Sequence, residues 1–247
     1  MTATPHHADG TASPWVQRWT PLVAPGASVL DVACGRGRHM RWFAERGHAV
    51  TGVDRDTQAL EAARAWGETV WADIEVDPWP FEERRFGAVV VTNYLWRLLL
   101  ATILDSVQAG GVLIYETFAQ GNETVGRPSR PDFLLRPGEL LGLCSGPGWR
   151  VVAYEDGFLP EPERFVQRIA AVRLGDGART CCGKATTVLV RVAREAPLGP
   201  DAESGNPGVR DLEAEAEEAA AAAEEAGAAA PAAAPAAPVA PGTAAPA

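Results

Sequence analysis

The chain has 247 residues, of which 47% are hydrophobic and 22% charged, enough for one sizeable α/β domain or two small ones. Its formal net charge is −10 at pH 7, but nine acids and one base lie in residues 201–247, so residues 1–200 carry only −2 of that charge. The acidity therefore says nothing about a substrate, and the absence of a basic stripe argues against a nucleic-acid partner.

The two ends of the chain differ in composition from its middle. Residues 1–12 are interpreted as a flexible leader that lacks the basic start and apolar core of a secretory signal, so we expect a cytoplasmic protein with no membrane span. Residues 195–247 are rich in Ala, Pro and Glu and are predicted to be disordered, because little large apolar area offsets the entropy of ordering them. One folded domain is expected over residues 13–194.

The first half of that domain alternates predicted strands and helices. Ser13 and Pro14 indicate a helix start, with Trp15, Val16 and Trp19 on one face. Short β-branched runs then alternate with helical patterns, which is typical of a parallel sheet covered on both faces. The predicted strands are 28–32, 49–54, 69–73, 86–93 and 111–118, and the predicted helices are about 38–46, 56–66 and 96–108.

Beyond Phe118 the pattern changes. Residues 119–135 lack periodicity, and we expect the segment 116–123 to line an acceptor site or act as a lid, although an exposed surface loop explains it equally well. A helix near Pro137 and strands at 149–158, 165–174 and 186–193 follow. The predicted fold is α/β and Rossmann-like, a doubly wound, mostly parallel seven-stranded sheet with antiparallel final strands. Whether residues 186–193 join the sheet stays open.

The stretch "DVACGRG" follows the first strand, where a crevice opens beyond the carboxyl ends of a doubly wound sheet. Gly35 and Gly37 would let the backbone turn sharply and approach a ligand, although a purely structural turn also favours glycine. Asp54 ends the second strand, where a carboxylate can accept both hydroxyls of a ribose. Asp73 ends the third strand, within reach of the amine of an adenine. With Asp31, three carboxylates at strand ends indicate an adenosyl site.

The stretches "VLDVACGRGRH", "VTGVDRD", "WADIE", "VVVTNYLW" and "GGVLIYETF" resemble, in this order, the motifs of class I S-adenosylmethionine-dependent methyltransferases over residues 13–174. The small bacterial branch of tellurite-resistance-type methyltransferases is the most similar. The resemblance implies S-adenosylmethionine as cofactor, with no metal. It places the methionine end at Asp31 and at the turn that contains Ala33, Gly35 and Gly37, the ribose at Asp54 with Arg55, the adenine at Asp73 and Ile74, and the transferred methyl near Asn93.

The acceptor is not identified by the sequence, and we expect a small molecule. "NYLW" differs from the "NPPY" type of motif, which lowers the odds for methylation of adenine or glutamine amino groups. A general base is needed only if the acceptor must lose a proton, and the candidates are Tyr94 and Glu116, with Asn93 and His39 nearby. Each also has a structural interpretation: Tyr94 as a core aromatic, Glu116 as a strand-end acid, and His39 as a solvent-facing residue.

Two other functions compete with methyl transfer. An NAD(P)-dependent oxidoreductase would share the glycine turn and Asp54, but the third glycine that a pyrophosphate favours is replaced by His39 or Met40, and Lys184, the only lysine, makes no Tyr-xxx-Lys pair. A non-catalytic adenosyl-cofactor-binding or regulatory protein on the same fold is harder to exclude, because a fold and its motifs can outlast turnover. The sequence predicts no oligomeric state.

Overall fold

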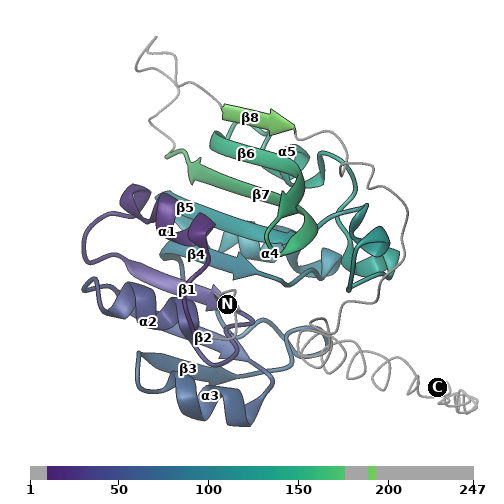
Figure 1. Ribbon diagram of the computed structural model, residues 1–247. Coiled ribbons are helices and arrows are strands. Elements are labelled where there is room, and N and C mark those ends of the chain that lie inside the picture. The colour runs from purple at the N-terminus through teal and green to yellow at the C-terminus, as the bar shows by residue number, and fades with distance from the viewer. Residues whose placement is uncertain (1–9, 176–188, 193–247) are drawn as a thin grey trace, which may run out of the picture. The chain divides into compact units, whose positions relative to one another are not determined.

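The computed structural model describes residues 10–175 and 189–192. Residues 1–9 of the expected leader and the whole of the expected tail at 195–247 lie outside these residues. Eight strands form one sheet in the order β3-β2-β1-β4-β5-β7-β6-β8 (Figure 1). The strands are β1 (Ser28–Val32), β2 (Ala49–Asp54), β3 (Glu68–Trp71), β4 (Phe86–Thr92), β5 (Val107–Phe118), β6 (Trp149–Pro160), β7 (Glu163–Arg173) and β8 (Leu189–Val192).

The strand directions confirm a doubly wound, mostly parallel sheet. Strands β3, β2, β1, β4 and β5 pair in parallel, and β7 is antiparallel to both of its neighbours, β5 and β6. The seven-stranded sheet is thus present, and residues 189–192 add an eighth strand that pairs with β6 in parallel. The reversed direction is therefore limited to β7, and β6 and β8 run in the same direction as β5.

The helices begin close to their predicted positions. In α1, Ser13 Oγ accepts a hydrogen bond from the Trp15 N–H at 3.1 Å, with Pro14 at the first helical position. In α3, Asp56 caps the first turn in the same way. The helices are α1 (Pro14–Trp19), α2 (Arg38–Ala44), α3 (Thr57–Ala63), α4 (Leu100–Asp105) and α5 (Glu139–Leu143), with short 3-10 turns at Thr20–Leu22, Arg97–Leu99, Asn122–Thr124 and Pro131–Phe133.

The predicted helix over 96–108 is wrong in its extent. Residues 97–99 form a 3-10 turn, and the α-helix covers only residues 100–105. Val107 already belongs to β5, where it pairs with Phe86, and the backbone passes through Gly110 at a φ of 77°. Glycine is unfavourable inside a helix, and the β-branched Val107 is stabilised by pairing in the sheet. The chain from Val107 onward is therefore part of β5.

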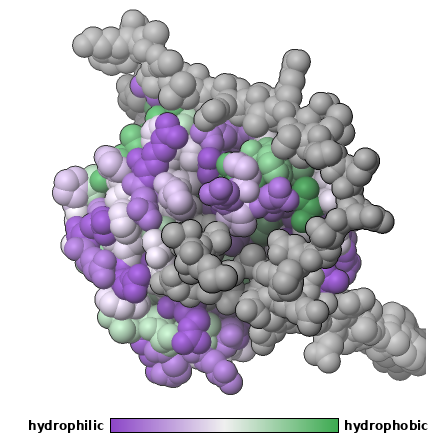
Figure 2. All heavy atoms as spheres, in the orientation of Figure 1, coloured by the Kyte–Doolittle hydropathy of each residue, from purple (hydrophilic) through white to green (hydrophobic). Residues whose placement is uncertain are grey.

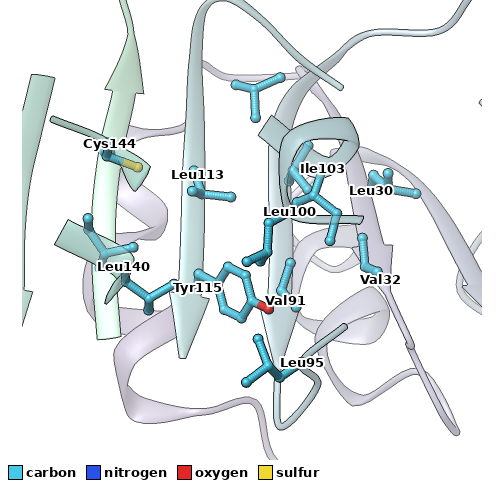
Figure 3. Packing of buried hydrophobic residues seen from close by; sticks show 14 of the residues in the cluster. Leu30, Val32, Val91, Leu95, Leu100, Ile103, Leu113, Tyr115, Leu140 and Cys144 are labelled. Carbon is cyan, nitrogen blue, oxygen red and sulfur yellow. The ribbon is translucent and has the colours of Figure 1, made fainter. Parts of the chain in front are cut away.

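The core lies on both faces of the sheet. Alternate strand residues point to opposite sides, so Val29 packs with α1, α2 and α3, and Leu30 packs with α4 and α5. Figure 3 shows the cluster that contains Leu30, in which Leu100 and Ile103 of α4 and Leu140 of α5 cover the strand residues. Both faces of the central strands are buried, as in other parallel sheets.

One edge of the sheet gathers the polar residues. The carboxyl ends of β1, β2, β4 and β5 meet there, and β7, which runs the other way, begins there. The surface in Figure 2 is mainly polar, with apolar residues in separate areas, and the exposed large hydrophobic residues of the described part are Trp71, Val76 and Leu98. No helix in the described part of the chain is long and apolar enough to cross a membrane.

Candidate functional site

The turn between β1 and α2 uses its two glycines for different purposes. Ala33, Gly35 and Gly37 all have left-handed backbones, with φ of 53°, 51° and 80°. A Cβ added to Gly37 would lie 2.9 Å from the Cβ of Ala63, so this glycine lets α2 start against α3. A Cβ added to Gly35 would meet nothing within 4 Å. The open space above Gly35 is thus where a ligand can approach the backbone.

Asp54 ties this turn to the end of β2. Its Oδ2 accepts a hydrogen bond from the Gly35 N–H at 2.7 Å, and its Oδ1 accepts one from the Asp56 N–H at 2.9 Å. Each carboxylate oxygen accepts a second hydrogen bond readily. The carboxylate is therefore held rigidly beside the open space, with one acceptor position left on each oxygen, and this arrangement suits two neighbouring hydroxyl groups.

The end of β3 brings together a second set of predicted residues. Arg55 Nη1 lies 3.9 Å from Asp73 Oδ2, and the Arg55 carbonyl accepts from Trp71 Nε1 at 2.8 Å. Ile74 is buried in the core. Burial and the negative charge of Glu75 raise the pKa of Tyr94, so its hydroxyl stays protonated at neutral pH. The charges of Asp73 and Arg55 also act on the Tyr94 hydroxyl, so Tyr94 lies close to this set of residues.

A buried pair, Asp31 and His39, lies between the turn and α1. The Ser13 N–H donates to His39 Nε2 at 3.2 Å, which places the imidazole proton on Nδ1, 3.8 Å from Asp31 Oδ1. Burial and then the positive charge of Arg38 lower the pKa of His39, so the ring is neutral. The solvent-facing interpretation of His39 is wrong, because its side chain is 2% exposed.

Asp31 itself is an unusual carboxyl group. It is 1% exposed, and its Oδ2 has no hydrogen-bond partner among the described residues. Burial raises the pKa of Asp31 to about 7, although the positive charge of Arg38 opposes this shift. A buried carboxyl oxygen without a donor is costly, and a ligand cation placed beside it would remove that cost.

Glu116 holds the N-terminal segment against the sheet. Its Oε1 accepts from Ser13 Oγ at 2.8 Å, and its Oε2 lies 3.2 Å from Arg168 Nη1. The Arg168 guanidinium also donates from Nε to Glu155 at 2.8 Å and lies over the Trp15 ring. Both oxygens of Glu116 are therefore engaged, which favours a positioning role over that of a free base, and its predicted catalytic role stays a prediction.

The remaining predicted residues lie at the same edge. Asn93 has a left-handed backbone with a φ of 54°, and its N–H donates to the Glu116 carbonyl at 3.0 Å, so it follows β4 directly beside β5. In the expected lid, Asn122 is buried and accepts from the Phe165 N–H at 3.1 Å. The segment 116–123 is thus attached to β7. Cys34 is buried, and burial raises the pKa of its thiol, so this side chain packs as a small neutral residue and is not activated as a nucleophile.

Sequence reasoning missed three arginines. Arg38, in the first turn of α2, lies 3.4 Å from Thr92 Oγ1 at the end of β4. Arg164 and Arg168 are in β7, four residues apart, and so share a face. The spacing was readable in the sequence, but only the pairing of β7 beside β5 shows that its first residues reach the edge where the ligand space lies.

These features define a class of protein. A doubly wound sheet with a single reversed strand between β5 and β6, a glycine turn after β1 and a carboxylate at the end of β2 form the class I methyltransferase fold. Residues 29–111 match the family model described as a methyltransferase domain. The match covers the glycine turn, Asp54, Asp73 and β4.

The curated and solved relatives agree with this class. A malonyl-[acyl-carrier protein] O-methyltransferase of Salmonella typhimurium is 34% identical over 110 residues, which are 39% of this chain and 41% of that protein. The chain thus spans about two fifths of the length of this relative and of a protein of the same name from Serratia marcescens, which is 33% identical over 107 residues. A methyltransferase from Methanosarcina mazei has a TM-score of 0.51 at 15% identity and covers 66% of this chain and 99% of its own. TehB from Haemophilus influenzae has a TM-score of 0.52 at 18% identity and covers 70% and 64%.

The stability of the protein should depend on the protonation of Asp31. The pKa of this carboxyl is about 7 in the folded chain and near the ordinary aspartate value of 3.8 when unfolded, so the folded state binds more protons between these values. The free energy of unfolding should therefore fall as pH rises from 4 to 7, by roughly 2–4 kcal/mol. Asp31→Asn should remove this fall. His39, whose pKa is lowered, contributes with the opposite sign and is present in both proteins. Urea unfolding of both at pH 5 and pH 8 measures the difference, and equal pH dependence would contradict the prediction.

The two turn glycines should respond differently to alanine. Both have positive φ, so each substitution carries a backbone strain of roughly 1–2 kcal/mol. Gly37→Ala adds an overlap with Ala63 and should cost about 1–3 kcal/mol more. Gly35→Ala points its methyl into open space and should instead weaken the binding of S-adenosylhomocysteine. Urea unfolding and calorimetric titration of the two variants separate these effects. Equal losses of stability would show that the roles are not divided.

Proposed function

We propose that this protein transfers a methyl group from S-adenosylmethionine to a small-molecule acceptor. The observation that carries the proposal is the Asp54 carboxylate, which the N–H groups of Gly35 and Asp56 hold beside the open space above Gly35. A rigid acceptor pair at this position fits the two hydroxyl groups of a ribose. The methyltransferase domain match over residues 29–111 supports the same cofactor.

The other predicted residues fit the remaining parts of that cofactor. The orphaned Oδ2 of Asp31 suits the ammonium group of the methionine part, and the nearby guanidinium of Arg38 suits its carboxylate. Ala33 and Gly37 shape the turn around Gly35. Arg55, Asp73 and Ile74 would surround the adenine, and Asn93 would lie near the transferred methyl group.

The protein's own contribution to the reaction is alignment and exclusion of water. When bound, the cofactor supplies a methyl group on a sulfonium, which is already activated for displacement. Ser13 bonds to both His39 and Glu116, and so holds the N-terminal segment over this edge of the sheet. The hydroxyl of Tyr94 stays protonated, and Glu116 is engaged at both oxygens. We therefore assign no general base, and expect catalysis to come from orientation of the acceptor.

The acceptor is small in this proposal because residues 1–200 carry a net charge of only −2, so no excess of positive charge favours a nucleic acid. The curated relatives named malonyl-[acyl-carrier protein] O-methyltransferases match over little more than 100 residues, so they support methyl transfer more than a shared acceptor. An oxygen atom as acceptor agrees with their names. The cytoplasm is the proposed location.

Asp54→Asn should weaken the binding of S-adenosylhomocysteine by roughly 1.5–3 kcal/mol, because it removes charge-assisted hydrogen bonds to the ribose. The matched control is Asp132→Asn, which removes an exposed carboxylate whose ion pair is with Arg130 and should leave the affinity unchanged. Isothermal titration calorimetry measures both variants. Equal affinity in the two variants would show that the ribose lies elsewhere.

The intact chain should transfer labelled methyl from S-adenosylmethionine to the small-molecule fraction of a cell extract. The transfer should be lost in Asp54→Asn and kept in Asp132→Asn. Binding of S-adenosylhomocysteine without any transfer would favour the non-catalytic alternative. Thermal stabilisation by NAD(P)H alone, with none by either sulfur ligand, would contradict the proposal and favour the oxidoreductase.

A further inference from the structure

Three arginines gather at the edge of the sheet where β7 begins. Arg164 and Arg168 share one face of β7, and Arg38 reaches over from α2. Burial lowers the pKa of Arg164, and the positive charges of Arg168 and Arg38 lower it further, against the opposing effect of Glu116. Arg164 is thus repelled by the other two guanidinium groups at a place where solvent screens little of that repulsion.

The nearby carboxylates are mostly committed to one of these arginines. Arg168 is bonded to Glu155 and paired with Glu116. Glu155 is also approached by Arg18, at 3.8 Å, and Glu116 also accepts from Ser13. The negative charges of Glu155 and Glu116 are thus already balanced by groups other than Arg164.

Arg164 is left with one distant partner. Its side chain is 13% exposed, and its Nη2 lies 4.0 Å from Glu116 Oε1, the one carboxylate within that distance among the described residues. This separation is too long for a hydrogen bond. Its Nε is buried and has no hydrogen-bond partner in residues 10–175 or 189–192. A mostly buried guanidinium with an unsatisfied Nε and one long ion pair costs stability, so a structural role explains it poorly.

The position of Arg164 points to the methyl acceptor. Because β7 is antiparallel to β5, Arg164 lies just beyond the last β5 pair, Phe118 with Val166, at the carboxyl edge of the sheet. Arg38, which influences it, contacts Thr92 at the end of β4, and Asn93 follows directly. β7 lies beyond β4 and β5 in the sheet, so Arg164 is on the side of the crevice away from Asp54 and Asp73. The end of β4, where Asn93 is proposed to lie near the transferred methyl, is on the same side of these two acids.

We propose that Arg164 binds a negatively charged group of the acceptor, so that the substrate is a small molecule bearing a carboxylate or another oxyanion. The inference rests on the proposed function and narrows its substrate class. A guanidinium offers a planar fork of N–H donors that matches a carboxylate or phosphate in bidentate fashion. The positive sulfonium of the cofactor would add to the attraction of an anion.

Titrations with simple probes test the proposal before any substrate is identified. The anionic probes are benzoate and inorganic phosphate, and the neutral isostere is benzamide, each followed by NMR chemical shifts of the intact chain at constant ionic strength. The variants are Arg164→Gln and Arg164→Lys. The matched control is Arg150→Gln, which removes an exposed arginine near the start of β6, at the opposite edge of the sheet.

The wild-type chain and Arg150→Gln should bind benzoate at least tenfold more tightly than benzamide. Arg164→Gln should abolish this preference, and Arg164→Lys should keep part of it, because the lysine retains the charge but loses the fork. Equal binding of benzoate and benzamide by the wild type would overturn the proposal, as would an unchanged preference in Arg164→Gln. If Arg164→Gln does not fold, a benzoate preference that is reduced in a folded Arg164→Lys relative to the wild type supports the proposal, and an unchanged preference overturns it. The tighter of benzoate and phosphate indicates whether the acceptor bears a carboxylate or a phosphate.

The same variants separate this inference from the proposed function. Arg164→Gln should change the affinity for S-adenosylhomocysteine less than threefold, whereas Asp54→Asn lowers it. Failure of S-adenosylhomocysteine to bind the wild type would overturn the proposed function, and the probe titrations without it would still report whether Arg164 binds anions. Normal S-adenosylhomocysteine binding with no anion preference would overturn the inference alone.

Discussion

The site depends on the hydrogen bond between the Gly35 N–H and the Asp54 carboxylate. This bond joins the turn after β1 to the end of β2, and the same carboxylate also accepts from Asp56 at the start of α3. A single side chain therefore links the turn before α2, the end of β2 and the residue before α3. The N–H groups of Gly35 and Asp56 offset the free energy of holding a partly desolvated carboxylate here. The carboxylate is therefore already in position before a ligand binds.

The edge of the sheet beyond this bond is unusual in how much polarity it buries. Asp31, His39 and Glu116 are each almost fully buried, and Ser13 connects His39 to Glu116. Such networks are costly when a polar atom lacks a partner, and the buried atoms without one include Asp31 Oδ2, at one end, and Arg164 Nε, at the other. The Asp31 carboxyl would bind a positive group and the Arg164 guanidinium a negative one. The two side chains lie on either side of the space where the cofactor and the acceptor are proposed to meet.

Much of the fold was predictable because it rests on local patterns. The β-branched runs that form β1, β2 and β4, and the cap at Ser13, carry their signals in a few neighbouring residues. The error at 96–108 has a different origin. The leucines at 98–100 correctly indicate a helix, but the choice between helix and strand at Val107 depends on pairing with Phe86 of β4. Helix limits set by long-range pairing are not visible in the residues themselves.

The sequence by itself determined the alternation of strands and helices, the glycine turn, and the acids at the ends of β1, β2 and β3, because each follows from composition and spacing along the chain. Only the tertiary structure decided that Gly35 faces open space while Gly37 packs on Ala63, and that Asp31 is an orphaned carboxyl. It also decided that Arg164, near the start of β7, lies beside the carboxyl end of β5, because β7 is antiparallel to β5. The physical reason is that burial, and the lack of a partner, belong to an environment assembled from distant segments, and no single segment carries that information.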